Sequence, residues 1–287
     1  MIDNIGFIGL GAMGSSMFPH LTQAGYNVFG FDIKKQISPI ERFSQVNNLK
    51  ELKHCEAIIF LLPDGKIVRD VASNLLQLNI RTLFIDMSSS DPRDTQALAL
   101  QVNKAGSILI DAPVSGGVSR ARKAELTIMV GGNPKNIDLA TPLLSTMGAI
   151  KIAGQLGAGH AMKALNNYVS AAGLIASFEA LAAARVFGIK SDAFLNIINN
   201  ATGRNNTTEV KLDKFIIPEK YNSGFSLALQ TKDVAIANTL LQELVSDAPF
   251  SKSVHDYLVN AEASLKSSAD HTEIYQLIRA KSLSKAK

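Results

Sequence analysis

A run of glycines directly after an apolar segment limits most strongly what this chain can fold into. The hexamer GLGAMG follows the apolar run Asn4–Ile8 and opens a helical pattern over Gly11–Ala24. In a strand–turn–helix unit, the first glycine permits the tight turn, the second lets the backbone approach a pyrophosphate, and the third lets the helix pack on the strand. The free N–H groups at the helix start then face the phosphates. An ordinary Gly-rich turn is the alternative, but the context favours a dinucleotide-binding turn made by Gly9, Leu10, Gly11, Ala12, Met13 and Gly14.

The acid after the second apolar run bears on which dinucleotide binds. Asp32 follows Asn27–Phe31 and lies 18 residues after Gly14, near the spacing expected for the acid that binds the ribose hydroxyls. A carboxylate there repels a 2′-phosphate and favours NAD over NADP. Lys34 and Lys35 follow at once, and either could meet a phosphate. We therefore expect NAD as the cofactor and keep NADP open.

Short apolar runs alternate with helix-length segments through the first half of the chain. Between several of the runs lie helical patterns such as Asp64–Leu78 and Pro92–Lys104. This alternation predicts an α/β domain with a mainly parallel, doubly wound sheet and helices on both faces. The runs are bounded by Gly, Pro or Asp, and most are β-branched or aromatic-rich, as buried strands are. The predicted strands are Asn4–Ile8, Asn27–Phe31, Ala57–Leu62, Leu83–Asp86, Ser107–Ala112, Leu126–Gly131 and Ile150–Ile152.

Strand signals end near Gly159, and alanine-rich helical segments follow. The sequence therefore predicts a dinucleotide-binding domain over 1–158 and an all-α domain over 159–287, joined by a long helix. The apolar stretch from His160 to Gly188 contains Lys163 and Glu179, which would be costly in lipid, so we expect a buried helix of a soluble protein. The predicted helices are Ala161–Phe187, Ser191–Asn199, Leu227–Leu244 and Ser251–Ala263.

Composition excludes several classes of protein. The 287 residues are 46% hydrophobic, which is ample for a buried core. The net charge of +4 suits small anionic ligands and falls short of the clustered charge expected for a nucleic-acid partner. The single Cys55 excludes a disulfide framework, and the five histidines show no metal-ligand spacing, so no metal is expected. The start of the chain has Asp3 and no cationic region, so we predict no signal peptide, no membrane partner and a cytoplasmic location.

Two further features could carry chemistry. Ser115, Gly116 and Gly117 offer a hydroxyl and two unhindered N–H groups, which suit a carboxylate as well as a plain β-turn. Lys163 and Asn167 are four residues apart and share one helix face. The lysine either snorkels from a core helix or has a lowered pKa in a site at the domain junction. Lys232-Asp233 is either part of the same cleft or a surface ion pair.

Four separated motifs resemble the β-hydroxyacid dehydrogenase family, which includes 3-hydroxyisobutyrate dehydrogenase and tartronate semialdehyde reductase. They are GFIGLGAMGSSM, DAPVSGGVSRA, GAGHAMKALNN and TKDVAIA, and the resemblance covers essentially the whole chain. It implies a Rossmann domain, a long interdomain helix, and a helical domain that helps to form a homodimer or homotetramer.

The resemblance also implies roles for individual residues. Ser115, Gly116 and Gly117 would hold the carboxylate of the substrate, with Lys163 as catalytic acid/base and Asn167 as a substrate ligand. Lys232 would reach the nicotinamide side of the cleft, and Leu62, Pro63 and Ser89 would contact the dinucleotide. The chain departs from the family at Ala124, where many members have glycine, and at Ile67, where some have a polar residue.

The function predicted on these grounds is the reversible NAD-dependent oxidation of a short 3-hydroxy acid, similar to 3-hydroxyisobutyrate, to its semialdehyde. An NADPH-dependent reductase of glyoxylate, succinic semialdehyde or tartronate semialdehyde is the nearest alternative. A dinucleotide-binding module without catalytic activity is the alternative outside the enzymes. The sequence does not define the role of Thr202–Glu209, a polar run that either shapes the pocket or caps a helix.

Overall fold

The computed structural model describes residues 2–285 and divides the chain into two compact units, Met1–Lys163 and Ala164–Lys287. Each unit has its own hydrophobic core. The predicted boundary between residues 158 and 159 precedes this division by five residues. It falls at the first residues of the long helix α6 (Ala158–Phe187), which begins in the first unit and continues into the second.

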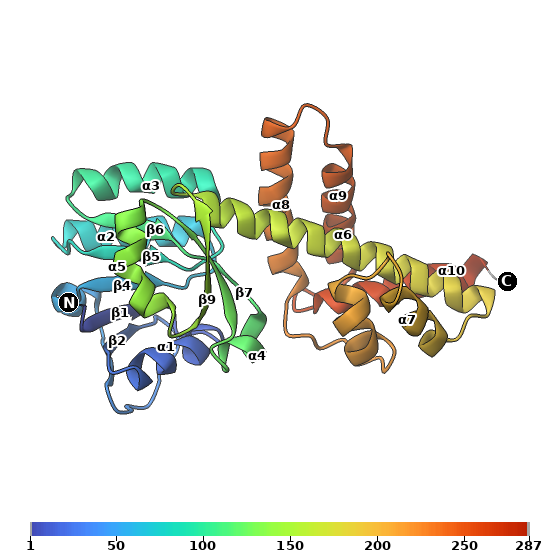
Figure 1. The fold of residues 1–287 in the computed structure, drawn as a ribbon, viewed down its shortest axis with the longest axis horizontal. Helices are drawn as coiled ribbons and strands as arrows, with labels where there is room; N and C mark the ends of the chain where they lie inside the picture. The colour runs from blue at the N-terminus through green and yellow to red at the C-terminus, as the bar shows by residue number, and fades with distance from the viewer. Residues whose placement is uncertain (1, 286–287) are drawn as a thin grey trace. The chain divides into compact units, whose positions relative to one another are not determined.

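The first unit is built on a nine-stranded sheet with helices on both faces (Figure 1). The strand order is β3-β2-β1-β4-β5-β6-β8-β7, with β9 paired to β8. All pairs are parallel except β6–β8 and β7–β8, so the mainly parallel sheet is confirmed. The strands are β1 (Asn4–Ile8), β2 (Asn27–Phe31), β3 (Phe43–Gln45), β4 (Ala57–Phe60), β5 (Leu83–Asp86), β6 (Ile108–Asp111), β7 (Val114–Ser115), β8 (Leu126–Gly131) and β9 (Gly148–Gly154).

Alternation along the central strands explains why both faces of the sheet are covered. In β4, Ile59 belongs to one apolar cluster, whereas Ile58 and Phe60 belong to another. Successive side chains of a strand point to opposite faces, so these clusters are two separate core layers. Helices α1 (Gly14–Gln23) and α5 (Pro134–Leu144) cover the first layer, and α2 (Gly65–Gln77) and α3 (Pro92–Lys104) cover the second.

The structure contains elements that the sequence patterns did not predict. Strand β3 has three residues and β7 has two, which is too short for an alternation signal. Helix α5 begins with Pro134 after the N-cap Asn133, whose side chain accepts the Lys135 N–H, and it also contains Pro142. A short 3₁₀ helix, η1 (Leu49–His54), and helix α4 (Gly117–Ala121) complete the first unit.

The second unit is helical, as predicted. Its elements after α6 are α7 (Ser191–Asn199), the π-helix η2 (Thr207–Ile216), α8 (Leu227–Leu244), α9 (Pro249–Ser264), the 3₁₀ helix η3 (His271–Glu273) and α10 (Ile274–Lys285). Helices α8 and α9 lie side by side (Figure 1). The polar run Thr202–Glu209 forms the turn into η2, where Oδ1 of Asn205 accepts the Thr207 N–H at 2.8 Å, so its capping interpretation is the one that the local contacts support.

Helix α6 is the one described helix that is long and apolar enough, by length and composition, to cross a membrane. Ala171, Leu174 and Phe178, together with Leu181, belong to the core of the second unit and are fully buried. Helix α6 therefore has the packing of a core helix.

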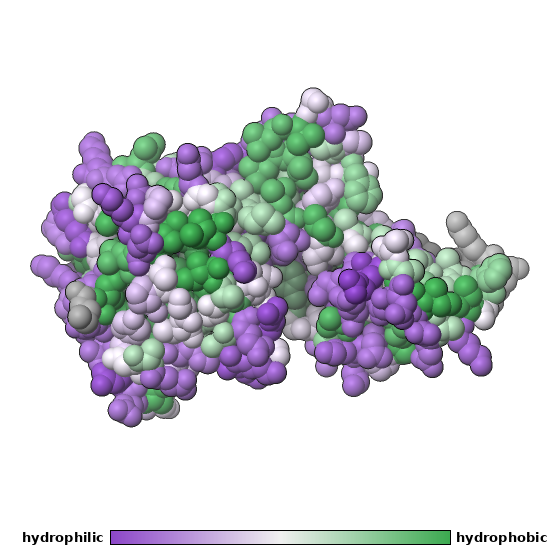
Figure 2. Space-filling model, in the orientation of Figure 1, coloured by the Kyte–Doolittle hydropathy of each residue, from purple (hydrophilic) through white to green (hydrophobic). Residues whose placement is uncertain are grey.

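Some apolar side chains of this unit do face outward: Leu244, Val245 and Phe250 are exposed around the turn from α8 to α9, where Figure 2 shows an apolar cluster.

The partly buried carboxylate of Asp270 joins the start of η3 to the segment before α8. Asp270 accepts hydrogen bonds from the Ser223 hydroxyl (2.8 Å) and from the backbone N–H groups of Gly224 and Phe225. His271 beside it is buried, and its ring packs edge-on against Phe225. Burial, reinforced by the nearby Lys211 ammonium, lowers the pKa of His271 to about 3. The second unit therefore holds this imidazole in its neutral form.

The lowered pKa of His271 predicts acid sensitivity of the second unit. The unfolded chain binds a proton at this residue below pH ~6.5 and the folded chain does not, so stability falls as the pH drops from there toward 3. By pH ~5 the loss attributable to this group reaches about 2 kcal/mol. Near-UV circular dichroism of tyrosine reports this unit, because four of the five tyrosines lie in it and the chain has no tryptophan.

The variant His271→Phe should lose less stability than the wild type between pH 7 and 5, since it removes the titrating group and keeps a ring of similar size. Phe225→Leu is the matched control, because it removes the ring contact and leaves the imidazole. Its pH dependence should follow that of the wild type. Equal slopes for His271→Phe and the wild type would contradict the assignment.

Candidate active site

The predicted dinucleotide turn follows β1 at the carboxyl edge of the sheet. Gly9 has φ +103°, and a Cβ there would lie 2.1 Å from the Leu61 carbonyl oxygen, after β4. A Cβ on Gly14 would lie 2.0 Å from the Gly9 carbonyl oxygen, so the start of α1 packs directly on the turn. A Cβ on Gly11 would meet nothing within 4 Å. The first and third glycines are thus required by close packing, and the second leaves open backbone where a pyrophosphate could approach.

Asp32, directly after β2, is hydrogen-bonded to this turn. Its Oδ2 accepts the Leu10 N–H at 2.8 Å, and its Oδ1 accepts the N–H groups of Lys34 (2.8 Å) and Lys35 (2.9 Å). Burial opposes ionisation of this carboxyl, but the three N–H groups and the Lys35 ammonium outweigh it and hold the pKa of Asp32 below its usual value. The acid predicted to bind ribose hydroxyls is therefore an ionised group that also shapes the loop.

The residues predicted to contact the dinucleotide follow the neighbouring strands. Leu62 and Pro63 lie in the loop after β4, and Ser89 lies in the loop after β5. The Leu62 N–H donates to the Ser88 hydroxyl at 2.9 Å, which ties the two loops together. Because β1 pairs with both β2 and β4, the strand order reverses direction at β1. In open α/β sheets, ligands bind outside the carboxyl ends of the strands at such a point.

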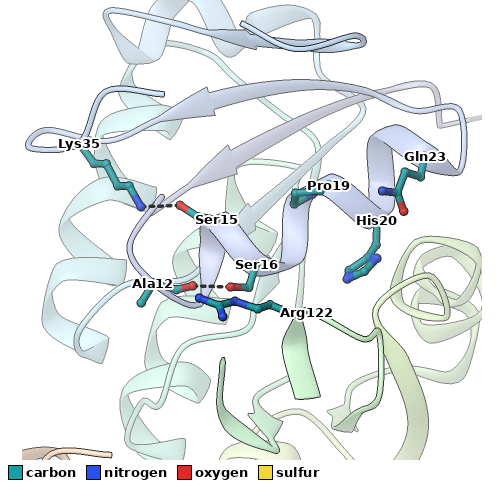
Figure 3. Close-up of a pocket in the computed structure, with 8 residues that line it drawn as sticks. All are labelled: Ala12, Ser15, Ser16, Pro19, His20, Gln23, Lys35 and Arg122. Carbon is teal, nitrogen blue, oxygen red and sulfur yellow. Dashed lines mark hydrogen bonds between the residues drawn. The ribbon is translucent and has the colours of Figure 1, made fainter. Parts of the chain in front are cut away.

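A cavity of about 470 Å³ runs along the outer face of α1, with Lys35 and Arg122 among its lining residues (Figure 3). The Lys35 ammonium donates to the Ser15 hydroxyl at 2.7 Å. Arg122 reaches the cavity from the end of α4, beside Ala12 and Ser16. The sequence patterns indicated neither Ser15 nor Arg122 as a site residue. The signal that could have found Ser15 is the spacing of Ala12, Ser15, Ser16, Pro19, His20 and Gln23 along one helix face. Arg122 lies at the end of α4 and is not part of that face.

Ser115, Gly116 and Gly117 form a turn from strand to helix, so the alternative of a plain turn between two strands is wrong. Ser115 ends β7, Gly116 precedes the helix with φ +138°, and Gly117 begins α4 with φ +66°. A Cβ on Gly117 would meet nothing within 4 Å, which leaves its backbone open to a ligand. His20 of α1 contacts the Ala121 carbonyl oxygen through Nε2 at 2.8 Å. The helix of the dinucleotide turn and the helix of the serine–glycine turn are thus joined.

The two departures from the family pattern have different consequences. Ala124, where many members have glycine, has φ +56°, a left-handed conformation that costs an L-residue roughly 1–2 kcal/mol. This backbone geometry explains why glycine suits the position. Ile67 lies in the first turn of α2, where Asp64 caps the helix by accepting its N–H at 2.9 Å, and its side chain is partly exposed.

Lys163 and Asn167 lie four residues apart on α6, and the division between the units falls directly after Lys163. In the second unit, the Asn167 amide donates to Oδ2 of Asp233 at 2.6 Å, and both side chains are buried. The Lys232 ammonium lies 3.4 Å from Oδ1 of the same carboxylate. Asp233 is 2% exposed, so the alternative of a surface ion pair at Lys232-Asp233 is wrong.

The structure thus gathers the predicted residues in two groups. The first unit brings together the glycine turn, Asp32 and the loops after β4 and β5, and connects α1 to the serine–glycine turn. The second unit brings Asn167 and Lys232 to Asp233. Among the described residues, no group of three or more His, Cys, Asp or Glu side chains could hold a metal ion.

Two family models match the chain, one after the other. The model for the NAD-binding domain of 6-phosphogluconate dehydrogenase matches residues 4–157, more than half of the chain. The model described as NAD-binding of NADP-dependent 3-hydroxyisobutyrate dehydrogenase matches residues 157–278. The chain belongs to the β-hydroxyacid dehydrogenase family. Members are NAD(P)-dependent oxidoreductases that act on CH–OH groups, so the predicted enzyme class is confirmed.

Named relatives span most of the chain. 2-(Hydroxymethyl)glutarate dehydrogenase of Eubacterium barkeri is 35% identical over 81% of this chain and 80% of the relative. The mitochondrial 3-hydroxyisobutyrate dehydrogenase of Drosophila melanogaster is 32% identical over 96% of this chain and 89% of the relative. The structure of Mycobacterium tuberculosis 3-hydroxyisobutyrate dehydrogenase with L-serine is similar, with a TM-score of 0.87 and 29% identity, and covers 97% of this chain and 100% of that one. The Rossmann-type first unit followed by a helical unit is confirmed.

Proposed function

We propose that this family member catalyses the reversible NAD-dependent oxidation of a short 3-hydroxy acid to its semialdehyde. The observation that carries the proposal is the contact between His20 and the Ala121 carbonyl oxygen. It joins two glycine turns with open backbone, at Gly11 and at Gly117, within one unit. One turn has the form that binds a pyrophosphate, and the other has the donors that bind a carboxylate.

The residues of the first unit fit a bound dinucleotide. The open backbone at Gly11 and the start of α1 would hold the pyrophosphate, and the Asp32 carboxylate would accept the ribose hydroxyls. The loops with Leu62, Pro63 and Ser89 would line the rest of the dinucleotide site. When bound, NAD supplies the acceptor for the hydride that leaves the carbinol carbon.

The chain's own residues would then bind the substrate and move its proton. The Ser115 hydroxyl and the N–H groups of Gly116 and Gly117 would fix the carboxylate, which orients the carbinol carbon. Lys163, as a neutral amine, would take the hydroxyl proton and return it in the reverse direction. Asn167 would hydrogen-bond the substrate, with its amide oriented by the buried Asp233 carboxylate. That carboxylate would also orient the Lys232 ammonium.

The names of the relatives indicate which part of a substrate these residues would recognise. 3-Hydroxyisobutyrate, 2-(hydroxymethyl)glutarate and L-serine share the frame HOCH₂–CH(R)–COO⁻ and differ in R. The serine–glycine turn would bind the shared carboxylate, and Lys163 would act on the shared hydroxyl. We therefore propose an acid of this frame as the substrate, with a small R as in 3-hydroxyisobutyrate.

A second candidate function is an NADPH-dependent reductase of a small semialdehyde or of glyoxylate. The observation in its favour is the cavity beside α1, where Lys35 and Arg122 provide two cations and Ser15 and Ser16 provide hydroxyl groups. Such a set suits a phosphate. Against it stands the ionised Asp32 at the end of β2, which repels a 2′-phosphate. We give precedence to NAD because the Asp32 charge is fixed by three backbone bonds, whereas Lys35 is exposed.

We also propose that the enzyme is cytoplasmic and forms a homodimer or homotetramer. The single cysteine, Cys55, is buried and has no second cysteine in the chain with which to form a disulfide. Leu244 is 79% exposed and Phe250 is 60% exposed at the turn from α8 to α9. Exposed apolar clusters of this kind mark interaction sites, and we propose a second copy of the chain as the partner.

Lys163→Ala should nearly abolish turnover and keep the affinity for NAD within a few fold. General acid–base catalysis contributes ~10²–10⁴-fold to the rate, and the lysine does not belong to the dinucleotide turn. The measurement is the initial rate of NADH formation with 3-hydroxyisobutyrate, glycerate, serine and 2-(hydroxymethyl)glutarate. Lys104→Ala, at the far end of α3, serves as the control and should retain activity. A Lys163→Ala protein that loses NAD affinity and folding together would refute the role.

The wild type should have a higher kcat/KM with NAD than with NADP. Asp32→Asn should raise the ratio of NADP to NAD use about tenfold, equivalent to about 1.4 kcal/mol, because it removes the charge and keeps one of the two acceptor oxygens. Lys35→Gln should lower NADP use and leave NAD use unchanged, with Lys34→Gln as the control. A preference of the wild type for NADP that is lost in Lys35→Gln would establish the second candidate instead.

Sedimentation velocity of the wild type should show a dimer or a tetramer. The double variant Leu244→Ser with Phe250→Ser should dissociate toward the monomer, since it removes apolar surface that the proposed partner would cover. Leu100→Ser is the matched control, because Leu100 is 74% exposed in the first unit and lies outside the proposed surface. A monomeric wild type would overturn the proposal.

A further inference from the structure

The first turn of α6 is held by a carboxylate buried at the end of β6. Asp111 is fully buried, and its Oδ1 accepts the Gly157 N–H at 2.8 Å while its Oδ2 accepts the His160 N–H at 2.8 Å. The N–H groups at a helix start have no partner within the helix, so a buried start needs such an acceptor. A carboxylate there also interacts favourably with the helix dipole. Asp111 thus fixes how far α6 extends toward the sheet.

The side chain of His160 forms a second connection, between α6 and helix α3. It is fully buried, and its Nδ1 lies 2.8 Å from the Thr95 hydroxyl oxygen on α3. The Thr95 hydroxyl also lies 3.1 Å from the Asp91 carbonyl oxygen, so it has hydrogen-bond partners on both α3 and the His160 ring. This bond connects the first turn of α6 to a helix that belongs to the core of the first unit.

A second buried carboxylate faces the other ring nitrogen. Nε2 of His160 lies 3.7 Å from Oδ2 of Asp86 and has no hydrogen-bond partner among the described residues. Asp86 is held in turn by the Ser88 N–H and the Ser90 hydroxyl, each at 2.9 Å. The ring therefore lies among α3, the end of β5 and the end of β6, with little freedom to turn.

The backbone of this first turn of α6 packs closely against the backbone of the sheet. A Cβ on Gly159 would lie 2.3 Å from the Met129 carbonyl oxygen and 2.8 Å from Oδ2 of Asp111. A Cβ on Gly131 would lie 2.9 Å from the Gly159 nitrogen. The start of α6 is therefore seated directly on the edge of the sheet, and any larger side chain would lift it.

We propose that His160 is a positioning residue for Lys163, an inference that rests on the proposed function. The two residues are three apart and share a helix face. Asp111 fixes the helix along its axis, and the His160–Thr95 bond fixes its rotation about that axis. A rotation of roughly ten degrees moves a side chain at about 6 Å from the axis by about 1 Å. A misplacement of about 1 Å can cost about 10²-fold in rate.

The experiment compares two substitutions at His160. His160→Leu removes the hydrogen bond to Thr95 and should lower kcat about 10²-fold, with KM for NAD little changed. His160→Asn places an amide nitrogen near the position of Nδ1 and should restore most of the rate. Val102→Ala is the matched control. It weakens the core under the same helix α3 but leaves the His160–Thr95 hydrogen bond in place, and it should keep kcat.

A second readout does not depend on the substrate. The rate of Lys163 modification by an amine-reactive reagent, followed by mass spectrometry across pH, should change in His160→Leu and recover in His160→Asn, while Lys104 stays constant. Absence of turnover by the wild type would refute the proposed function, and the modification profile would still test the positioning role. The inference is overturned if His160→Leu behaves like Val102→Ala at equal melting temperature, in kcat and in modification.

Discussion

The two N–H bonds accepted by Asp111 are the interaction on which the functional geometry of the first unit depends. They satisfy the buried start of α6 at the end of a sheet strand, where water cannot do so. Without this acceptor the buried N–H groups would each cost about 1–3 kcal/mol, and the helix would start elsewhere. The position of Lys163, one turn further, follows from this start. Burying a carboxylate costs free energy, and the two N–H groups that Asp111 accepts, one on each oxygen, offset part of that cost.

Backbone N–H groups also bind a carboxylate at the predicted dinucleotide turn. Asp32 collects three of them, and in doing so fixes both its own charge and the conformation of the loop after β2. The same carboxylate that would select the ribose thus also shapes the turn that would bind the pyrophosphate. Lys35 and Arg122 line the cavity along α1, so the proposed cofactor preference would be a balance between one partly buried anion and two exposed cations.

The sequence predicted most of the first unit because its signals are local. A glycine spacing, strands of four to six buried residues and proline or aspartate at helix starts are all visible in neighbouring positions. Elements without a local signal were missed: β7 has two residues, and η2 is a π-helix, which no periodicity indicates. The motif GAGHAMK indicated Lys163, but not that its histidine reaches Thr95, 65 residues earlier. Hydrogen-bond partners that are distant in the sequence depend on the strand order, which a single sequence does not reveal.

The difference between local motifs and contacts of distant residues also explains why the reaction is easier to infer than the substrate. In the proposed function, Ser115, Gly116 and Gly117 would bind the carboxylate and Lys163 would act on the hydroxyl of the frame HOCH₂–CH(R)–COO⁻, which the compounds in the relatives' names share. None of these proposed roles involves the group R. Selection among acids of this frame must therefore come from side chains that shape the space around R, and a pocket wall of ordinary apolar residues discriminates one methylene by only about 1–3 kcal/mol. Relatives with different substrates can consequently keep the same motifs, and a change of R requires changes only outside them.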